Sequence, residues 1–238
     1  MNLAVIFAGG SGKRMHAKDR PKQFLFVHGK PIIVHTIEIF NRHPQIDGIV
    51  VVCIEDWIPY MEKLKYTFRL DKIASIVPGG ETGQLSIYNG LAEAARIFGR
   101  EDHVVLIHDG VRPLIDEDLI TANIECVKEH GTSISCGPVS ETVVLVDDAE
   151  QVQEVVNRNH SRVAKAPQGY RLDDVLDVEE RAISEGLTNM IDTCTLMRHY
   201  GHDLSIVDCG ADNVKITTPE DFFMFRAVAD ARENEQLM

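Results

Sequence analysis

The chain has 238 residues and is acidic, with 24 lysines and arginines against 37 aspartates and glutamates and a formal net charge of −13. This length suffices for one large α/β domain whose core needs neither disulfides nor metals. The acidic balance argues against general binding to nucleic acids or membrane surfaces, because neither polyanion is attracted to it. Five scattered cysteines without C-x-x-C spacing indicate reduced core thiols, and no apolar run is long enough to span a bilayer. We therefore expect a cytoplasmic protein, without a signal peptide.

Strands alternate with helical patterns through the first half of the chain, which predicts a mostly parallel sheet. The predicted strands cover residues 3–7, 48–54, 74–77 and 104–107. The predicted helices cover residues 31–41, 55–68, 82–98 and 116–130. Ligands of open α/β sheets collect at the carboxyl ends of strands, so the loops 9–14, 79–86 and 108–113 should face one crevice.

The second half begins with a predicted strand at 132–136 and a predicted hairpin whose strands, 143–146 and 152–156, flank a polar turn. This hairpin is rich in valine, and two strands alone are marginal in water, so we expect it to pack against another copy. No regular element is predicted for 158–168. Helices are predicted at 172–185 and 192–200, a strand at 204–207, and a last helix capped by Thr218. Without linkers or repeats, we expect a single domain over 1–238.

A glycine-rich loop follows the first strand directly. Gly9, Gly10 and Gly12 lack β-carbons, so several backbone N–H groups can converge there on an anion. Basic side chains are concentrated in the same stretch, at Lys13, Arg14, Lys18, Arg20 and Lys22. The stretch matches neither the Walker A loop nor the dinucleotide fingerprint. It indicates a polyphosphate site, and an ordinary glycine turn with solvated charges is the alternative.

Two further loops carry candidate ligand-binding groups. Asp109 could hold Mg²⁺ against a triphosphate, with a structural ion pair to Arg112 as the alternative. Gly79, Gly80 and Ser86 offer backbone amides and a hydroxyl that could read the edge of a base. A simple helix cap by Thr82 would explain part of that stretch equally well.

Six motifs occur in order along the chain: G-G-S-G-K-R-M, P-K-Q-F, G-G-E-T-G-Q-x-S, H-D-G-V-R-P, A-P-Q and A-D-N-V-K-I-T-T-P-E-D. Together they resemble, over nearly the whole chain, the CTP-dependent cytidylyltransferases that act on polyol phosphates. The resemblance implies a Rossmann-like nucleotidyltransferase fold, a mostly parallel sheet with helices on both faces and a protruding β-hairpin arm. It also implies a homodimer whose arms, at about residues 139–156, interlock.

The resemblance assigns roles to individual residues. It implies that Arg14, Lys22 and Lys215 are catalytic, because they grip the triphosphate and stabilise charge at the α-phosphorus. The implied nucleotide-binding residues are Ala8, Gly9, Gly10, Gly12, Lys13, Gly79, Gly80, Ser86 and Asp109. The implied polyol-phosphate residues are Arg112, Thr142, Arg158 and Asp192, of which Thr142 and Arg158 come from the partner's arm. Asp109 and Asp212 are the implied ligands of a Mg²⁺ cofactor.

Two family branches differ in their acceptor, which is D-ribitol 5-phosphate in teichoic-acid and capsule synthesis or 2-C-methyl-D-erythritol 4-phosphate in isoprenoid synthesis. The stretch Ile191-Asp192-Thr193-Cys194 looks more like the ribitol branch, whereas A-P-Q replaces the usual T-P-Q on the acceptor side. We therefore expect transfer of CMP from CTP to D-ribitol 5-phosphate, giving CDP-ribitol and pyrophosphate. Methylerythritol phosphate is the alternative acceptor, and a non-catalytic nucleotide-binding dimer is the alternative class.

Overall fold

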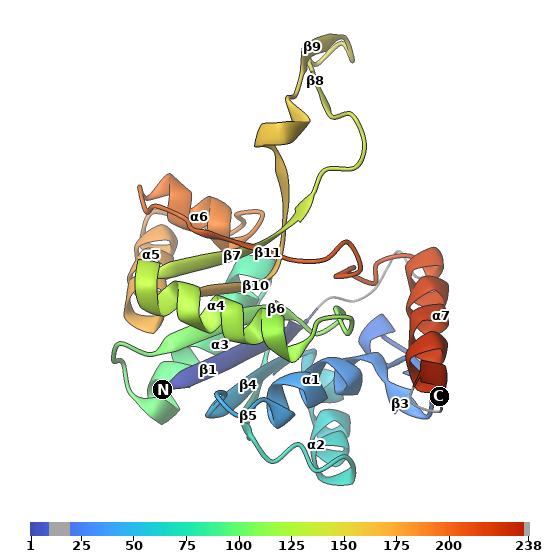
Figure 1. Cartoon of the computed structure of the whole chain (residues 1–238). Coiled ribbons are helices and arrows are strands. Elements are labelled where there is room, and N and C mark those ends of the chain that lie inside the picture. The colour runs from blue at the N-terminus through green and yellow to red at the C-terminus, as the bar shows by residue number, and fades with distance from the viewer. Residues whose placement is uncertain (10–19, 236–238) are drawn as a thin grey trace.

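A computed structural model of the chain describes residues 1–9 and 20–235. In this part of the chain a seven-stranded sheet has the order β11-β7-β10-β6-β1-β4-β5 (Figure 1). Its strands are β1 (Asn2–Ala8), β4 (Gly48–Cys53), β5 (Ile73–Pro78), β6 (Val104–Asp109), β7 (Thr132–Pro138), β10 (Arg162–Arg171) and β11 (Ile206–Asp208). Strand β10 is antiparallel to both β6 and β7, while the other neighbouring pairs are parallel. The predicted mostly parallel sheet is confirmed.

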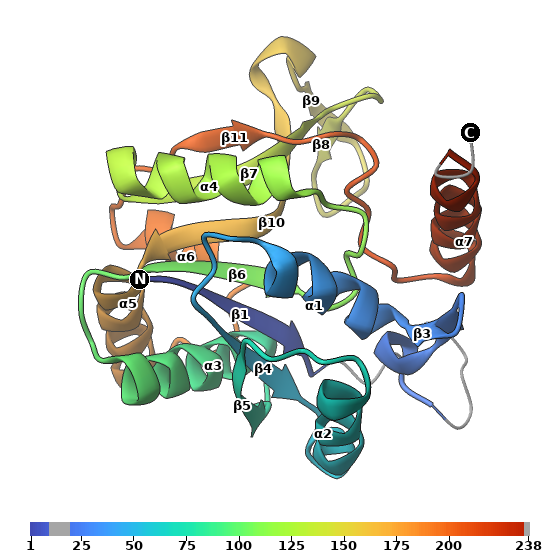
Figure 2. The ribbon, with the colours of Figure 1, turned by 60° about the horizontal axis from the view of Figure 1, so that its bottom comes forward.

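Helices cover both faces of the sheet (Figure 2). The apolar strands bury alternate residues on opposite faces, so Leu3 and Val5 of β1 belong to one core cluster and Ala4 and Ile6 to the other. The cluster around Leu3 includes α3 (Gly83–Phe98), α5 (Leu172–Ser184) and α6 (Thr193–His199). The cluster around Ala4 includes α1 (Ile32–Arg42), α2 (Ile58–Thr67) and α4 (Glu117–His130). The predicted layering is therefore confirmed.

Local sequence signals delimit the helices. At the start of α4 the Asp116 side chain accepts a hydrogen bond from the Leu119 backbone N–H at 2.8 Å. The helix ends at Gly131, whose φ of +81° lies in the left-handed region that favours glycine. The last helix, α7 (Pro219–Glu235), begins as predicted, with the Asp221 N–H donating to the Thr218 hydroxyl at 3.4 Å.

A small third cluster packs α7 against the rest of the molecule. It joins Phe225 of α7 to Val27, Ile32 and Ile216. Val27 belongs to a short hairpin formed by β2 (Phe26–Val27) and β3 (Lys30–Pro31), which follows the 3-10 turn η2 (Lys22–Phe24) and was not predicted. Ile216, which belongs to this cluster, lies in the segment between β11 and α7. This segment crosses the edge of the sheet at which the parallel strands end (Figure 1).

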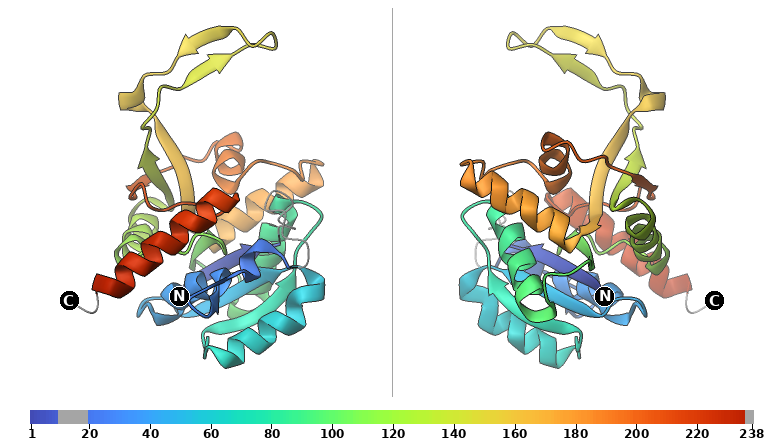
Figure 3. Two further views of the ribbon diagram at one scale, coloured as in Figure 1. Left: turned by 90° about the vertical axis from the view of Figure 1, so that its right-hand side faces the viewer. Right: turned by 90° about the vertical axis from the view of Figure 1, so that its left-hand side faces the viewer.

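An antiparallel hairpin projects from the body between β7 and β10 (Figure 3). It consists of β8 (Val144–Val146) and β9 (Val152–Val155), with the 3-10 turn η4 (Arg158–His160) after it. Its valines are exposed to solvent, and Val146, Val152 and Val155 are each more than half exposed. The predicted hairpin is confirmed, and we call it the arm.

Two stretches differ from the prediction. Residues 162–171 form β10, a strand paired on both sides, although no element was predicted for residues 158–168. Pro167 and Gly169 are unfavourable in the interior of a strand, so the local sequence pattern does not predict β10. The pairing of β10 with β7 shifts register between Ala164 and Gln168. The predicted helix at 55–68 begins instead as the 3-10 turn η3 (Glu55–Trp57) and continues as α2.

Among the described residues, every helix is too short or too polar to cross a membrane.

Candidate active site

A cavity of about 340 Å³ lies at the carboxyl ends of β1 and β6. This is the edge at which the predicted loops were expected to meet, since parallel strands that end together bring their loops together. The cavity is bordered by β10, by the N-terminal turns of α3, by α5 and by the segment that leads into α6. Its polar lining residues include Gln84, Asp109, Arg112, Lys165, Gln168, Glu179, Asp192, Thr193 and Lys215.

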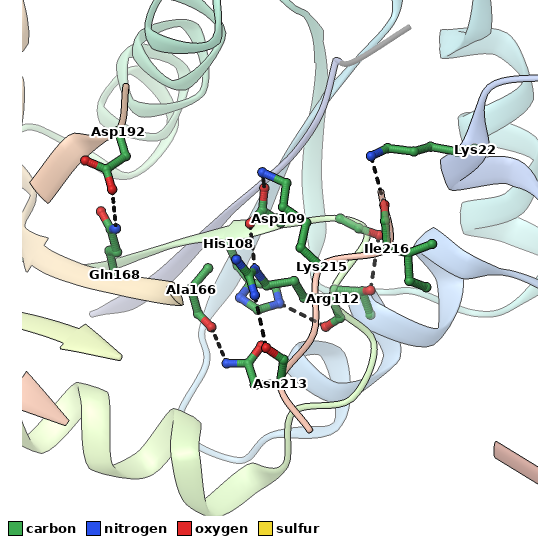
Figure 4. Close-up of polar contacts among 12 residues, drawn as sticks. Lys22, His108, Asp109, Arg112, Ala166, Gln168, Asp192, Asn213, Lys215 and Ile216 are labelled. Carbon is green, nitrogen blue, oxygen red and sulfur yellow. Dashed lines mark hydrogen bonds and ion pairs between the residues drawn. The ribbon is translucent and has the colours of Figure 1, made fainter. Parts of the chain in front are cut away.

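Asp109, the last residue of β6, carries a buried carboxylate between two cations (Figure 4). Its Oδ2 accepts from Arg112 Nε at 2.8 Å, and its Oδ1 accepts from Lys215 Nζ at 2.6 Å. Burial alone would raise the pKa of Asp109, but the Lys215 ammonium and the Arg112 guanidinium outweigh it and hold that pKa below its usual value. Asp109 is therefore ionised at neutral pH, and the three side chains together carry a net positive charge.

Lys22 joins this group from the other end of the chain. Its Nζ donates to the backbone oxygen of Ile216 at 2.8 Å, next to Lys215 (Figure 4). The segment that carries both contacts is anchored, because the Arg112 guanidinium donates to the Asn213 backbone oxygen and the Asn213 amide donates to the Ala166 backbone oxygen. The structure thus brings together Lys22, Asp109, Arg112 and Lys215, as expected from their sequence motifs.

His108 supports the loop without adding charge. Its Nε2 lies 3.1 Å from the backbone oxygen of Arg112 and donates to it. Burial lowers the pKa of His108 to about 4, so the ring is neutral at physiological pH. The positive charge of the site therefore comes from its lysines and arginine.

A second edge of the site is formed by small residues. The Gly80 N–H donates to Ser86 Oγ at 3.0 Å, and that hydroxyl donates to the Thr82 backbone oxygen at 2.8 Å. A β-carbon on Gly79 would lie 3.0 Å from Ser86 Oγ, and one on Gly9 would lie 3.5 Å from the same atom. The structure therefore brings Gly9, Gly79, Gly80 and Ser86 together. Thr82 also caps α3, so the helix-cap alternative describes part of this stretch correctly.

The wall formed by α3 and α5 contains a residue that sequence analysis missed. Glu179 is fully buried, its Oε2 accepts from Gln84 Nε2 at 3.0 Å, and burial raises its pKa to about 7. In the sequence Glu179 is one of several acids on a charged helix. The available signal was helical spacing, because Val175, Leu176 and Ala182 place it on the apolar face of α5.

Asp192 lies on the side of the cavity next to α6. It caps this helix by accepting from the Thr195 N–H at 2.9 Å, and its Oδ2 lies 3.4 Å from Gln168 Nε2 (Figure 4). The Gln168 side-chain oxygen in turn accepts from the Tyr170 hydroxyl and the Cys194 N–H. Burial raises the pKa of Cys194 to about 12, so this thiol is protonated and unreactive at neutral pH.

Several predicted residues lie elsewhere. Thr142 and Arg158 are exposed on and beside the arm and do not line the cavity of their own chain. Asp212, expected to share a metal with Asp109, instead lines a separate hollow with Asp116 and Asp208. The sharing of a metal by Asp212 and Asp109 stays a prediction.

The structure describes the glycine-rich loop only at its start. Ala8 ends β1, and its backbone oxygen accepts from Gln23 Nε2 at 2.6 Å. The predicted site residues Gly10, Gly12, Lys13 and Arg14 lie outside the described residues.

The whole chain resembles known proteins. A family model described as IspD, 2-C-methyl-D-erythritol 4-phosphate cytidylyltransferase, matches residues 2–231. A ribitol-5-phosphate cytidylyltransferase of Streptococcus agalactiae serotype V is 56% identical over 237 residues, which cover 100% of this chain and 98% of the relative. A 2-C-methyl-D-erythritol 4-phosphate cytidylyltransferase of Clostridium botulinum is 33% identical, covering 94% of this chain and 95% of the relative. The crystal structure of 4-diphosphocytidyl-2C-methyl-D-erythritol synthase from Anaerococcus prevotii has a TM-score of 0.81 at 25% identity and covers 96% of this chain and 95% of that one.

Proposed function

Because the chain belongs to the IspD family of cytidylyltransferases, we propose that it transfers CMP from CTP to D-ribitol 5-phosphate, forming CDP-ribitol and pyrophosphate. The observation that carries the choice of acceptor is the identity of 56% with a ribitol-5-phosphate cytidylyltransferase, against 33% with a methylerythritol-phosphate enzyme, each over nearly the whole chain. The sequence Ile191-Asp192-Thr193-Cys194 at the cavity supports the same choice.

The chemistry needs positioning and fixed positive charge. A phosphate oxygen of the acceptor bonds to the α-phosphorus of CTP, the bond to the bridging β-phosphate oxygen breaks, and pyrophosphate leaves with the electron pair. The attacking phosphate is already ionised, so the reaction needs no general base. Lys22, Lys215 and Arg14 stabilise the charge that develops around the α-phosphorus, and the anchored segment next to Ile216 holds the first two in place.

The nucleotide binds along the glycine edge. Ala8, Gly9, Gly10, Gly12 and Lys13 bind the β- and γ-phosphates with backbone amides, as expected of a glycine-rich loop after a strand. Gly79, Gly80 and Ser86 contact the cytosine, and the close approach of Gly9 and Gly79 to Ser86 Oγ supports one continuous binding surface.

Asp109 is the proposed Mg²⁺ ligand. Its carboxylate is ionised and each oxygen accepts one hydrogen bond, which leaves lone pairs for a cation. One carboxylate with phosphate oxygens and waters is a usual environment for Mg²⁺, so the donor set fits. When bound, the metal would neutralise triphosphate charge and polarise the α-phosphoryl group. Asp212 is the second proposed Mg²⁺ ligand, and in this structure it lines a separate hollow.

The acceptor site is completed by a second copy of the chain. Arg112 and Asp192 contact the polyol phosphate from within the chain, and Thr142 and Arg158 of the partner subunit reach it on the arm. The exposed valines of the arm support this arrangement, because a solitary hairpin with such a surface is only marginally stable in water.

The test is pyrophosphate release with CTP and Mg²⁺, run side by side with D-ribitol 5-phosphate and 2-C-methyl-D-erythritol 4-phosphate. We expect kcat/KM to be at least about tenfold higher with ribitol 5-phosphate, the scale at which a site selects between similar ligands. Omission of Mg²⁺ with a chelator should abolish release. Preferential use of methylerythritol phosphate would overturn the proposed acceptor and favour the second candidate, which the family description supports.

A further inference from the structure

The carboxyl group of Glu179 is only half satisfied. Its Oε2 accepts from Gln84 Nε2, whereas its Oε1 is buried and has no hydrogen-bond partner among residues 1–9 and 20–235. Buried polar atoms are nearly always hydrogen-bonded, and one left unsatisfied costs stability. Because Glu179 lines the substrate cavity, a bound molecule can supply the missing donor.

Neighbouring groups hold this carboxyl in one orientation. Gln84 Nε2 also donates to the Leu187 backbone oxygen at 2.9 Å, and its Oε1 accepts from the Met190 N–H at 2.9 Å. Gln84 is therefore fixed by three hydrogen bonds and cannot turn to serve the second oxygen of Glu179. The carboxyl group of Glu179 is therefore held in a constant position at the wall of the cavity, as a recognition group requires.

Packing alone does not call for a carboxyl group at this position. The buried face of α5 is otherwise apolar, with Leu172, Val175, Leu176 and Ala182. Leucine would fill a similar volume without the cost of burying a carboxyl group. A residue that lowers stability and faces a substrate cavity is better explained by binding than by folding.

The chemistry of the unpaired oxygen identifies its ligand. Near neutral pH the carboxyl exists both ionised, when Oε1 accepts a hydrogen bond, and protonated, when Oε1 can donate one, and a hydroxyl group can pair with either form because it both donates and accepts. The acceptor's phosphate is drawn to the lysines and to Arg112, which leaves its hydroxyl-bearing carbons for the remainder of the cavity. The expected polyol-phosphate residues Arg112 and Asp192 line this cavity together with Glu179, whereas Gly79, Gly80 and Ser86 of the expected cytosine site lie beside it, so the acceptor is the better source of the hydroxyl than CTP.

We infer that Glu179 binds a hydroxyl of the acceptor's polyol chain through Oε1 and thereby makes the enzyme discriminate against acceptors that cannot reach it. This inference rests on the proposed function. It assigns a specificity-determining role to a residue of α5, with Gln84 as its positioning residue. An acceptor with fewer carbons lacks the hydroxyl that pairs with Oε1. It therefore binds more weakly, because a buried polar group of the site stays without a hydrogen bond.

The experiment compares wild type, Glu179→Leu and Glu179→Gln with Glu180→Gln as the control. Glu180 is the next residue of α5 and forms an exposed ion pair with Arg100, outside the cavity. Steady-state rates are measured with D-ribitol 5-phosphate, D-erythritol 4-phosphate and glycerol 3-phosphate. We expect Glu179→Leu to raise KM for ribitol 5-phosphate at least tenfold, to leave KM for CTP unchanged and to reduce discrimination against the shorter acceptors.

Thermal unfolding separates this role from a structural one, because Glu179→Leu should be at least as stable as wild type while it binds the acceptor more weakly. Glu179→Gln keeps an oxygen for Gln84 and should lose less acceptor affinity. An unchanged kcat/KM ratio among the three acceptors, or an increase in KM for CTP instead, would overturn the inference alone. A wild-type enzyme that ignores all three acceptors would overturn the proposed function as well.

Discussion

At the scale of single residues, the site is organised by one buried carboxylate. Asp109 holds Lys215 and Arg112 in place through ion pairs. Lys22 donates a hydrogen bond to the backbone of Ile216, the residue after Lys215. A buried charge pair is costly to break, because the remaining partner stays desolvated. Lys22 is therefore a cleaner target than Lys215 for testing the role of positive charge.

Lys22→Ala should lower kcat by about 30- to 10³-fold, or roughly 2–4 kcal/mol of transition-state stabilisation. The reason is the loss of a fixed cation next to the proposed α-phosphorus. Pyrophosphate release at saturating CTP measures this effect. Lys128→Ala is the control, because Lys128 forms an exposed ion pair with Glu125 on α4. Unchanged turnover in Lys22→Ala would remove Lys22 from the catalytic residues.

Glu179 should make stability depend on pH. Burial raises its pKa from 4.5 to about 7, so between these values the folded chain binds more protons than the unfolded chain. The free energy of unfolding should therefore fall as pH rises from about 4.5 through 7, by at most about 3 kcal/mol from this residue. Glu179→Leu should lack this component.

Urea unfolding of wild type and Glu179→Leu at pH 5 and pH 8 measures the difference. The variant should gain relative stability at the higher pH, whereas Glu180→Gln should follow wild type. Parallel pH dependences of wild type and Glu179→Leu would show that the pKa of Glu179 is not raised.

At the scale of elements, the arm has two unlike faces. Val144 pairs with Val155 and Val146 with Val152, while Leu145 pairs with Glu154 on the other side of the ribbon. Alternation along β8 separates Val144 and Val146 from Leu145, and the register shift between Leu145 and Val146 brings Val152 and Val155, three residues apart on β9, opposite these two valines. The valine face is the surface that we expect to be buried against a second copy.

Val155→Asp should therefore weaken the homodimer, because it places an unpaired charge in an apolar contact. Sedimentation at micromolar concentration should show a dimer for wild type and a shift toward monomer for the variant. Glu154→Gln changes a neighbouring residue on the other face and should leave the dimer intact. A monomeric wild type would contradict the proposed assembly directly.

At the scale of the whole molecule, the arm projects away from the body of its own chain (Figure 3). If Arg158 acts in the partner's site, two inactive variants can complement each other. In a heterodimer of Arg158→Ala and Lys22→Ala, one site keeps both native residues. One of the two sites is then active, so the purified heterodimer should have about half of the wild-type activity.

Co-expression of the two variants with different affinity tags, followed by purification through both tags, isolates the heterodimer. Each variant alone should be nearly inactive. Failure of the heterodimer to recover activity would indicate that each arm serves its own chain, whereas full activity of Arg158→Ala alone would show that Arg158 is not needed for acceptor binding.

The sequence by itself determined the order and type of most elements. Continuous apolar runs such as residues 48–53, alternating with helical spacing, are local signals that identify buried strands and their crossover helices. Caps at Asp116 and Thr218 marked helix starts for the same reason, since a cap involves residues within one turn. The motifs that carried the resemblance also gave Asp109, Lys22 and Lys215.

Only the tertiary structure decided how distant segments meet. Strand β10 acquires its regular structure from β6 and β7 on either side, so Pro167 and Gly169 misled an analysis of local pattern. Glu179 is distinguished from the other acidic residues of α5 only by its burial beside Gln84, and the path of its loop places Asp212 in a hollow separate from the cavity that Asp109 lines. Hydrogen-bond partners and burial depend on residues far away in the sequence, which local propensity does not encode.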